Sequence, residues 1–167
     1  MNNILLICGG NSVEHEISVI TALQLINKYK GKYKLHLCYL KNGEFYYVKK
    51  HNDYSFYNKT SKLHKINFKA NKHFVTVGFK KICFDGILLG VHGINCEDGT
   101  LYSYFKTLNI NVINENIYSA SVGQDKVFSK KLSEVNYIPY LYVDRWLFAK
   151  DKKKILNFLV LCSLTFW

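Results

Sequence analysis

A short, wholly apolar segment near the N-terminus constrains the fold more than any other feature of this chain. Ile4–Cys8 is followed directly by Gly9-Gly10, and an apolar run of this length that stops at turn residues is typical of a strand buried on both faces. The apolar residues that come next are Val19, Ala22, Leu23 and Ile26. Their i, i+3, i+4, i+7 spacing predicts a helix, which we expect Gly31 to close. Tyr33–Leu40 then predicts a second strand, so the chain opens with a β-α-β unit.

The same alternation of strands and helices returns after a less regular segment. Asn42-Gly43 predicts a hairpin turn, and residues 49–81 read as an irregular insertion with short strands. A second apolar run, Gly86–Val91, predicts another buried strand. The remaining expected elements are a helix around 101–108, a short strand at 112–113, a third amphipathic helix through Val127, Phe128, Leu132 and Val135, and an extended segment, Tyr137–Val143, around Pro139. This order predicts an α/β fold with a doubly wound, mainly parallel sheet.

Composition excludes several classes of protein. The net charge is +11, yet Arg145 is the single arginine among 23 basic residues, and a diffuse lysine coat argues against a nucleic-acid reader. Five cysteines without a C-x-x-C pair indicate neither a disulfide framework nor a zinc finger. The His and Cys positions have no recurring ligand spacing, so we expect no metal site. Met1-Asn2-Asn3 lacks a signal-peptide pattern, which favours a cytoplasmic protein. The apolar tail 155–167 is shorter than a membrane span, so we expect no membrane contact and interpret it as a buried element.

Two glycine-containing loops carry the residues that could support chemistry. Residues 9–16 include Glu14 and Glu16, and residues 92–99 include His92 and the pair Glu97-Asp98. Because both loops follow parallel strands, a carboxylate and a histidine distant in sequence can converge on one ligand. Each residue also has a structural interpretation. The acidic residues can stabilise helix starts, with Asn11 or Ser12 as further caps, while His92 can be a packed histidine and Lys126 a solvated lysine.

The two loops resemble the signatures of a known family. Residues 9–19, Gly-Gly-Asn-Ser-Val-Glu-His-Glu-Ile-Ser-Val, are similar to the opening signature of the D-alanine–D-alanine ligases. His92-Gly93 through Glu97-Asp98-Gly99-Thr100-Leu101 resembles their second signature, and Asp125-Lys126 at a helix start agrees as well. The resemblance covers about residues 3–140.

The resemblance implies an ATP-grasp enzyme of peptidoglycan synthesis that uses ATP and magnesium to join two D-alanines. It implies residues 1–122 as the N-terminal substrate domain and 123–167 as the incomplete start of the central domain. By position, Glu14 would bind the ammonium of the first D-alanine, and His92 would act at its carboxyl group. Ser18 would also belong to the substrate site. Lys126 would contact the ATP phosphates.

This sequence also departs from the family pattern. Cys96 stands at a usual glycine, Tyr102-Ser103 at a usual Gln-Gly, and Gln124 at a usual methionine. Nothing in the chain resembles the later ATP-grasp segments or the magnesium ligands, so we expect the isolated chain to be inactive. A fragment, a frameshift product or a short homologue would each explain this.

Several alternatives stay open at this point. One is a non-catalytic binding or interaction module derived from the ligase N-terminal domain. Partners other than D-alanine would be a second copy of the chain or a separately encoded C-terminal half. The second substrate, D-alanine, D-serine or D-lactate, is also open.

Overall fold

The N-terminal apolar run forms the central strand of a five-stranded sheet. The computed structural model describes residues 3–49, 54–58, 63–114, 116–133 and 140–164, and the chain divides into two units, Met1–Gln124 and Asp125–Trp167. The elements of the first unit are β1 (Asn3–Gly9), α1 (His15–Lys28), β2 (Lys34–Lys41), β3 (Glu44–Val48), a 3-10 helix (Tyr54–Asn58), β4 (His64–Ile66), β5 (Phe74–Val77), β6 (Lys80–Cys83), β7 (Gly86–Leu89), α2 (Thr100–Thr107) and α3 (Ile117–Gln124). The second unit holds α4 (Lys126–Leu132), α5 (Arg145–Lys150) and α6 (Lys152–Leu164).

The sheet has the strand order β4-β3-β2-β1-β7. Strand β1 pairs in parallel with both β2 and β7, and a parallel bridge between Ile87 and Val112 supplies the short strand expected at 112–113. Strands β3 and β4 add an antiparallel edge, while β5 and β6 form a separate two-stranded sheet. The predicted α/β fold with a mainly parallel sheet is therefore confirmed, with an antiparallel edge that makes the sheet mixed.

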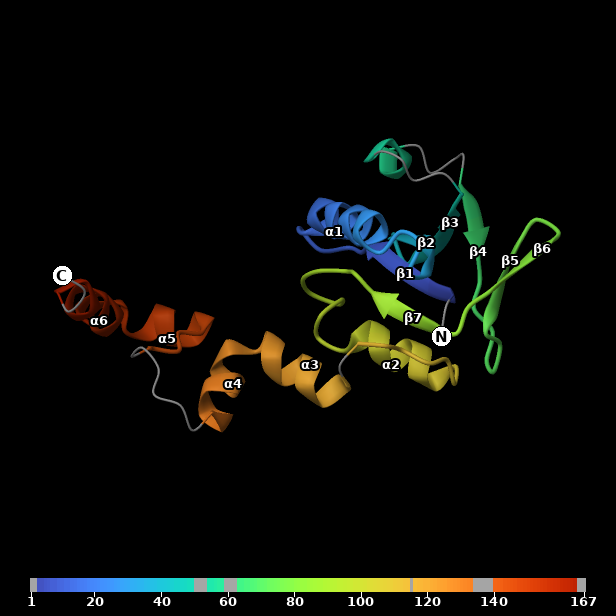
Figure 1. The fold of residues 1–167 in the computed structure, drawn as a ribbon. Helices are drawn as coiled ribbons and strands as arrows, with labels where there is room; N and C mark the ends of the chain where they lie inside the picture. The colour runs from blue at the N-terminus through green and yellow to red at the C-terminus, as the bar shows by residue number, and fades with distance from the viewer. Residues whose placement is uncertain (1–2, 50–53, 59–62, 115, 134–139, 165–167) are drawn as a thin grey trace. The chain divides into compact units, whose positions relative to one another are not determined.

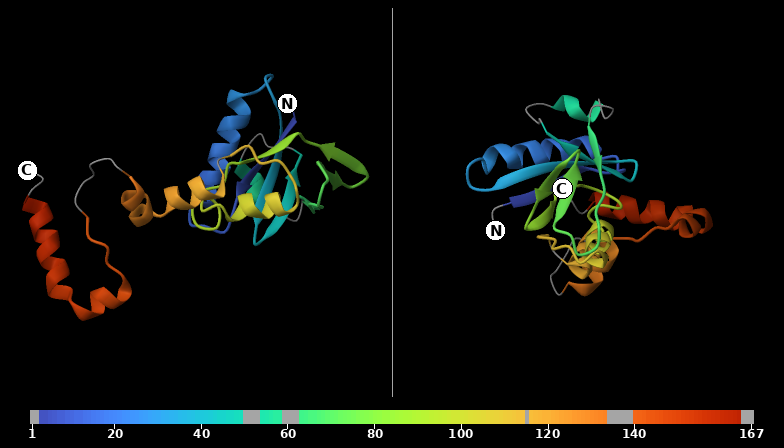
Figure 2. Two further views of the ribbon diagram at one scale, coloured as in Figure 1. Left: turned by 90° about the horizontal axis from the view of Figure 1, so that it is seen from below. Right: turned by 90° about the vertical axis from the view of Figure 1, so that its right-hand side faces the viewer.

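Apolar side chains of β1 are buried on both faces of this sheet. Leu6 and Cys8 pack with Val19, Ala22 and Leu23 of α1. Leu5 and Ile7 face the other way and pack with Leu101 and Phe105 of α2. Helices α1 and α2 lie on opposite sides of the strands in Figure 1, and α2 lies in front of them in the view from below in Figure 2. This arrangement is the doubly wound architecture that the continuous apolar run predicts.

The turn between β2 and β3 is the hairpin that Asn42-Gly43 predicts. Lys41 pairs with Glu44 across it, and the two intervening residues have positive φ values of 52° and 76°. This is the backbone conformation of the two-residue turn that Asn-Gly favours. Residues 49–81 include only short elements where the structure describes them, as the sequence analysis expects.

The C-terminal elements differ from the sequence expectations in two respects. The third amphipathic helix is α4, but none of its side chains is buried, and Val135 lies outside the described residues. Residues 155–164 of the apolar tail lie in helix α6, and among the positions whose burial is described, 155–159, the expected burial occurs at only one. Ile155 is buried there, whereas Leu156 and Leu159 are exposed. An apolar pattern determines which face of a helix can be buried. Burial itself requires other elements that pack on that face, and the described part of this unit supplies them at few positions.

Residues 137–139 of the predicted extended segment lie outside the described residues, and 140–144 form neither helix nor strand. None of the helices in the described residues combines the length and the apolarity that crossing a bilayer requires.

Gly9 has no side chain, which lets the end of β1 lie close to the neighbouring strand β2. Comparing Gly9→Ala with Gly78→Ala tests how much this close approach matters. Gly9 and Gly78 both have positive φ, at 93° and 61°, but a Cβ at Gly9 would collide with the Leu40 carbonyl oxygen, whereas one at Gly78 meets nothing within 4 Å. We expect Gly78→Ala to cost about 1–2 kcal/mol for its backbone conformation alone. Gly9→Ala should cost about 1–3 kcal/mol more, because the clash forces a backbone shift. Urea unfolding of both variants measures the difference, and equal losses would contradict the steric argument.

Candidate functional site

The loops that follow β1 and β7 lie against each other. The Ser12 hydroxyl donates a hydrogen bond to the His92 carbonyl oxygen at 2.5 Å, and a Cβ at Gly93 would come within 2.8 Å of the Ser12 hydroxyl oxygen. Parallel neighbouring strands deliver their following loops to the same edge of a sheet. The expected convergence of residues 9–16 and 92–99 is therefore confirmed.

A buried serine fastens the base of both loops to α1. The hydroxyl of Ser18 accepts the Gly9 N–H at 2.8 Å and donates to the Gly90 carbonyl oxygen at 2.8 Å. Its side chain has no exposed surface, so this hydroxyl fixes the two strand ends relative to the helix. A substrate contact of Ser18 remains a prediction.

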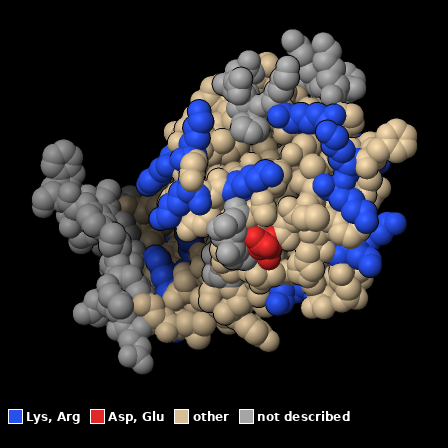
Figure 3. Space-filling view, turned by 45° about the vertical axis from the view of Figure 1, so that its right-hand side comes forward, with Lys and Arg blue, Asp and Glu red and all other residues tan. Residues whose placement is uncertain are grey.

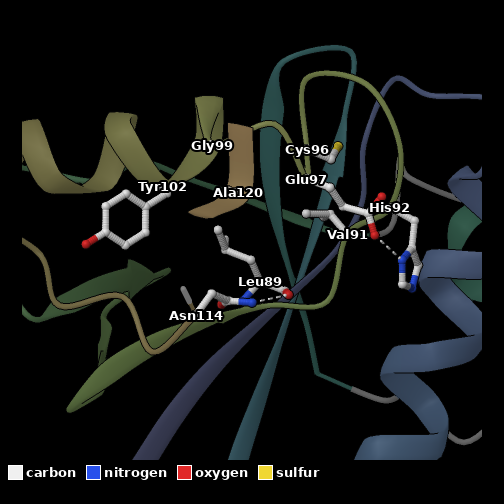
Figure 4. Close-up of a pocket in the computed structure, with 9 residues that line it drawn as sticks. All are labelled: Leu89, Val91, His92, Cys96, Glu97, Gly99, Tyr102, Asn114 and Ala120. Atoms are coloured by element: carbon white, nitrogen blue, oxygen red, sulfur yellow. Dashed lines mark hydrogen bonds and ion pairs between the residues drawn. The ribbon is translucent and has the colours of Figure 1, made fainter. Parts of the chain in front are cut away.

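His92 is held through both of its ring nitrogens. Its Nδ1 lies 2.9 Å from Glu97 Oε1, and its Nε2 lies 3.0 Å from the Thr21 hydroxyl oxygen in α1. Glu97 is fixed in turn, because its Oε2 accepts the Gly93 N–H at 2.9 Å. Figure 4 shows the His92–Glu97 contact beside α1. The predicted histidine is thus a positioned, partly exposed group with 27% of its side chain accessible.

The same contacts set the charge of Glu97. Burial by itself raises the pKa of this carboxyl group, but hydrogen bonds from the Gly93 N–H and from His92 outweigh that effect, and its pKa lies below the ordinary value. Glu97 therefore stays ionised beside the imidazole. Its neighbour Asp98 has the capping role that the sequence analysis considered for both residues, since its Oδ1 accepts the Thr100 N–H at 2.9 Å at the start of α2.

Glu14 completes a cluster with His92 and Glu97. One ligand atom from each of these three side chains lies within 4.8 Å of the others. Glu14 is exposed, and among the described residues its side chain makes no helix-capping hydrogen bond. The Ser12 hydroxyl oxygen accepts the Glu14 N–H at 3.1 Å, just before α1 begins. Two carboxylates and an imidazole that meet at an open edge form a suitable site for a cation.

His15, which follows Glu14 in the first loop, turns inward. His15 Nδ1 donates to the Gly10 carbonyl oxygen at 2.6 Å, and its Nε2 then accepts from the Tyr39 hydroxyl at 2.7 Å. Burial raises the pKa of Tyr39, which keeps that hydroxyl protonated as a donor. His15 thus supports the Gly9-Gly10 backbone and does not join the cluster.

A cavity of about 230 Å³ extends from His92 and Glu97 under the second loop. Its lining residues are Leu89, Val91, His92, Cys96, Glu97, Gly99, Tyr102, Asn114 and Ala120. Asn114 closes the end opposite the histidine, where its amide pairs with both backbone groups of Leu89 at 2.6 and 3.0 Å (Figure 4). Burial raises the pKa of the Cys96 thiol to about 11. Cys96 is therefore a neutral, buried lining residue.

Thr21 and Asn114 were missed by the sequence analysis. A signal for Thr21 was present, because Glu14, Ser18 and Thr21 follow the i, i+4, i+7 spacing and place three polar groups along one side of α1. No comparable pattern marks Asn114, whose role depends on the position of β7 after folding.

Lys126 belongs to the second unit and is exposed there. The preceding Asp125 is the N-cap of α4, where its Oδ1 accepts the N–H groups of Val127 and Phe128, both at 2.9 Å. Asp125 therefore has a structural function, which is to cap helix α4. A contact of Lys126 with ATP phosphates remains a prediction.

The converging donors fit magnesium poorly. Mg²⁺ prefers six oxygen ligands in octahedral geometry, whereas this cluster offers two carboxylates and an imidazole nitrogen. For ATP, the described residues of the signatures offer only Lys126.

The lysines are spread over the surface. Figure 3 shows several groups of Lys and Arg side chains on one face, some of which follow one another down its right-hand part. Three of them, Lys65, Lys69 and Lys72, line a shallow cavity of about 290 Å³ near β4 and β5. A solvated lysine coat without a nucleic-acid partner remains a prediction.

Comparisons with known proteins agree on one family. The family described as D-ala D-ala ligase N-terminus matches residues 3–114. The D-alanine–D-alanine ligase of Helicobacter pylori has a similar structure, with a TM-score of 0.77 and 23% identity over 94% of this chain and 51% of that one. The VanG D-Ala:D-Ser ligase of Enterococcus faecalis gives 0.71 and 22%, over 93% and 49%. The D-alanine–D-alanine ligase of Coxiella burnetii gives 0.69 and 22%, over 78% and 40%. The chain thus spans about half the length of these relatives, which share its fold.

The low pKa of Glu97 predicts a measurable pH dependence of stability. A carboxyl group whose pKa is lower in the folded state contributes stability above its unfolded pKa, and that contribution is lost as the pH falls through the folded pKa. We therefore expect the unfolding free energy of the wild type to fall more steeply than that of Glu97→Gln as the pH drops below about 5. Urea unfolding between about pH 3 and 7 tests this, with the exposed Glu16→Gln as the control. Parallel pH profiles for wild type and Glu97→Gln would contradict it.

Proposed function

The chain belongs to the D-ala D-ala ligase N-terminus family, and on that premise we propose that it is the substrate-binding part of an ATP-dependent ligase that joins two D-alanines. The observation that carries the proposal is the meeting of Glu14 and His92, one from each signature loop, at one edge of the sheet. In this proposal residues 1–122 are the substrate domain, and 123–167 begin the central domain.

Glu14 binds the ammonium group of the first D-alanine. Its carboxylate is exposed and lies at the start of α1, within 4.8 Å of ligand atoms of His92 and Glu97. An ammonium group that enters this cluster donates charge-assisted hydrogen bonds to the carboxylates. The neighbouring negative charge of Glu97 strengthens this preference for a cation.

His92 acts at the carboxyl end of the same amino acid. Its ring is held in place by Thr21 on one side and Glu97 on the other, and the substrate carboxyl group would take the place of one of these partners to accept the ring N–H. A fixed donor stabilises negative charge that develops on a carboxyl oxygen during reaction, because no reorganisation is needed at that moment. Thr21 and Glu97 are positioning residues in this scheme.

ATP supplies the phosphoryl group that activates the carboxylate in such ligases, and Lys126 is the residue proposed to contact its phosphates. The reaction belongs to peptidoglycan synthesis, which places the chain in the cytoplasm. The other half of the site would come from further polypeptide, either continuous with this chain or separately encoded. A non-catalytic module that binds D-alanine is the alternative, and the two experiments below separate these cases.

The first experiment tests binding of D-alanine to the chain. Amide NMR signals of residues 9–16 should shift when millimolar D-alanine is added, and Glu14→Gln should weaken this binding by about 10-fold or more, since it removes the charge opposite the ammonium group. Glu16→Gln is the matched control, because it removes a carboxylate two residues away. Equal affinities of the two variants would contradict the role of Glu14, and an absence of shifts in the wild type would contradict the substrate site.

The second experiment tests activity. We expect the purified chain to release no phosphate from ATP in the presence of D-alanine, because phosphoryl transfer depends on positioned charges around the phosphates and Lys126 is the single one assigned here. Phosphate release measures this, with a full-length ligase as the positive control. Turnover comparable to that enzyme would contradict the expectation.

A further inference from the structure

The cluster of Glu14, His92 and Glu97 suits a second kind of ligand besides an ammonium group. We propose that these three side chains bind a divalent transition-metal ion of the zinc type. We further propose that this ion competes there with D-alanine, a competition that rests on the proposed function. This ion is separate from the magnesium of the implied reaction, for which these donors are a poor fit.

The donor set is the first argument. Zinc sites with an open position use three protein ligands, commonly imidazole nitrogen and carboxylate oxygen, with water as the fourth. Here one imidazole and two carboxylates place their ligand atoms within 4.8 Å of one another. Tetrahedral zinc holds its ligand atoms about 3.3 Å apart, so a small inward movement closes the site. Glu14 can make this movement, because it is exposed and its side chain caps no helix end.

The second argument is the support behind the histidine. A histidine that ligates a metal through one ring nitrogen usually donates from the other nitrogen to a fixed acceptor. His92 Nε2 lies 3.0 Å from the Thr21 hydroxyl oxygen, outside the cluster. A hydroxyl can accept as well as donate, so Thr21 can support the tautomer with the proton on Nε2. That tautomer leaves Nδ1 open to the metal.

The third argument concerns charge. Glu97 is held in place by the Gly93 N–H, which donates to its Oε2 at 2.9 Å, and its Oε1 lies beside His92. Together, the carboxylates of Glu14 and Glu97 can balance the charge of a divalent cation. The buried Cys96 thiol, with its pKa raised to about 11, is not a thiolate ligand at neutral pH.

Zinc titration of the whole chain by calorimetry tests the site, with cobalt absorption as a second reading of four-coordinate geometry. The exposed thiol of Cys83 and the tail residue Cys162 are first replaced by serine, because free thiols also bind zinc. We expect one ion per chain. Glu14→Gln and His92→Asn should weaken zinc binding at least about 100-fold, and Thr21→Val about 10-fold.

His73→Asn is the matched control for His92→Asn. His73 directly precedes β5, is exposed and lies outside the cluster. It should leave zinc affinity unchanged. Circular dichroism of each variant verifies folding, and Glu14→Gln provides a substitution at an exposed side chain that caps no helix end. Unchanged zinc affinity in folded Glu14→Gln, or an equal loss in His73→Asn, would overturn the metal site.

Titration of D-alanine with and without zinc separates this proposal from the proposed function. Weaker D-alanine binding in the presence of zinc supports the competition. D-alanine binding in metal-free buffer without any zinc binding overturns the metal site alone. Zinc binding that requires Glu14 and His92, without D-alanine binding, supports the metal site and overturns the substrate site.

Discussion

The parallel pairing of β1 with β7 is the interaction on which the rest of the site depends. Four registered residue pairs, Ile4–Ile7 with Gly86–Leu89, align the two strands and bring their following loops to one edge. The pairing is buried on both faces, under α1 and α2, so the loops rest on a base that cannot shift without exposing apolar side chains. Residues about 80 positions apart thereby become neighbours, as the bond between Ser12 and the His92 carbonyl oxygen illustrates.

Helix α1 serves both the core and the site. Its apolar positions, including Val19, Ala22 and Leu23, pack on the sheet. Along another side it presents Ser18 to the strand ends and Thr21 to the ring of His92. The packing energy of the apolar side therefore fixes the polar groups in place, which is how a scaffold holds a site without strain in the site itself.

The site is locally negative, although the chain as a whole is positively charged. The protein carries a net charge of +11, yet Glu14 and Glu97 create a negative point at the edge of the sheet. A cationic group is attracted to this point, whether it is an ammonium group or a metal ion, and the surrounding lysines discourage cations elsewhere on the surface. The oriented imidazole of His92 then distinguishes these ligands, because it can donate to a carboxyl oxygen or coordinate a metal.

Sequence alone determined the opening β-α-β unit, the hairpin turn and the edge of the sheet at which the candidate site lies. The apolar run Ile4–Cys8, the Asn42-Gly43 turn and the helical spacing in α1 act through neighbours close in the chain, and each appears in the structure as its pattern predicts. The two signature loops could be expected at one edge for the same reason, since parallel strands leave no other arrangement.

Tertiary structure decided which polar side chain does what within those loops. Glu14 and His15 are adjacent in sequence, yet one is exposed beside His92 and the other is turned onto Gly10 and Tyr39. Likewise Asp98 caps α2 while Glu97 holds His92. Asn114 and Thr21 gained their roles only once β7 and α1 were in place. A side chain's hydrogen-bond partners depend on distances between distant segments, and sequence spacing does not contain those distances.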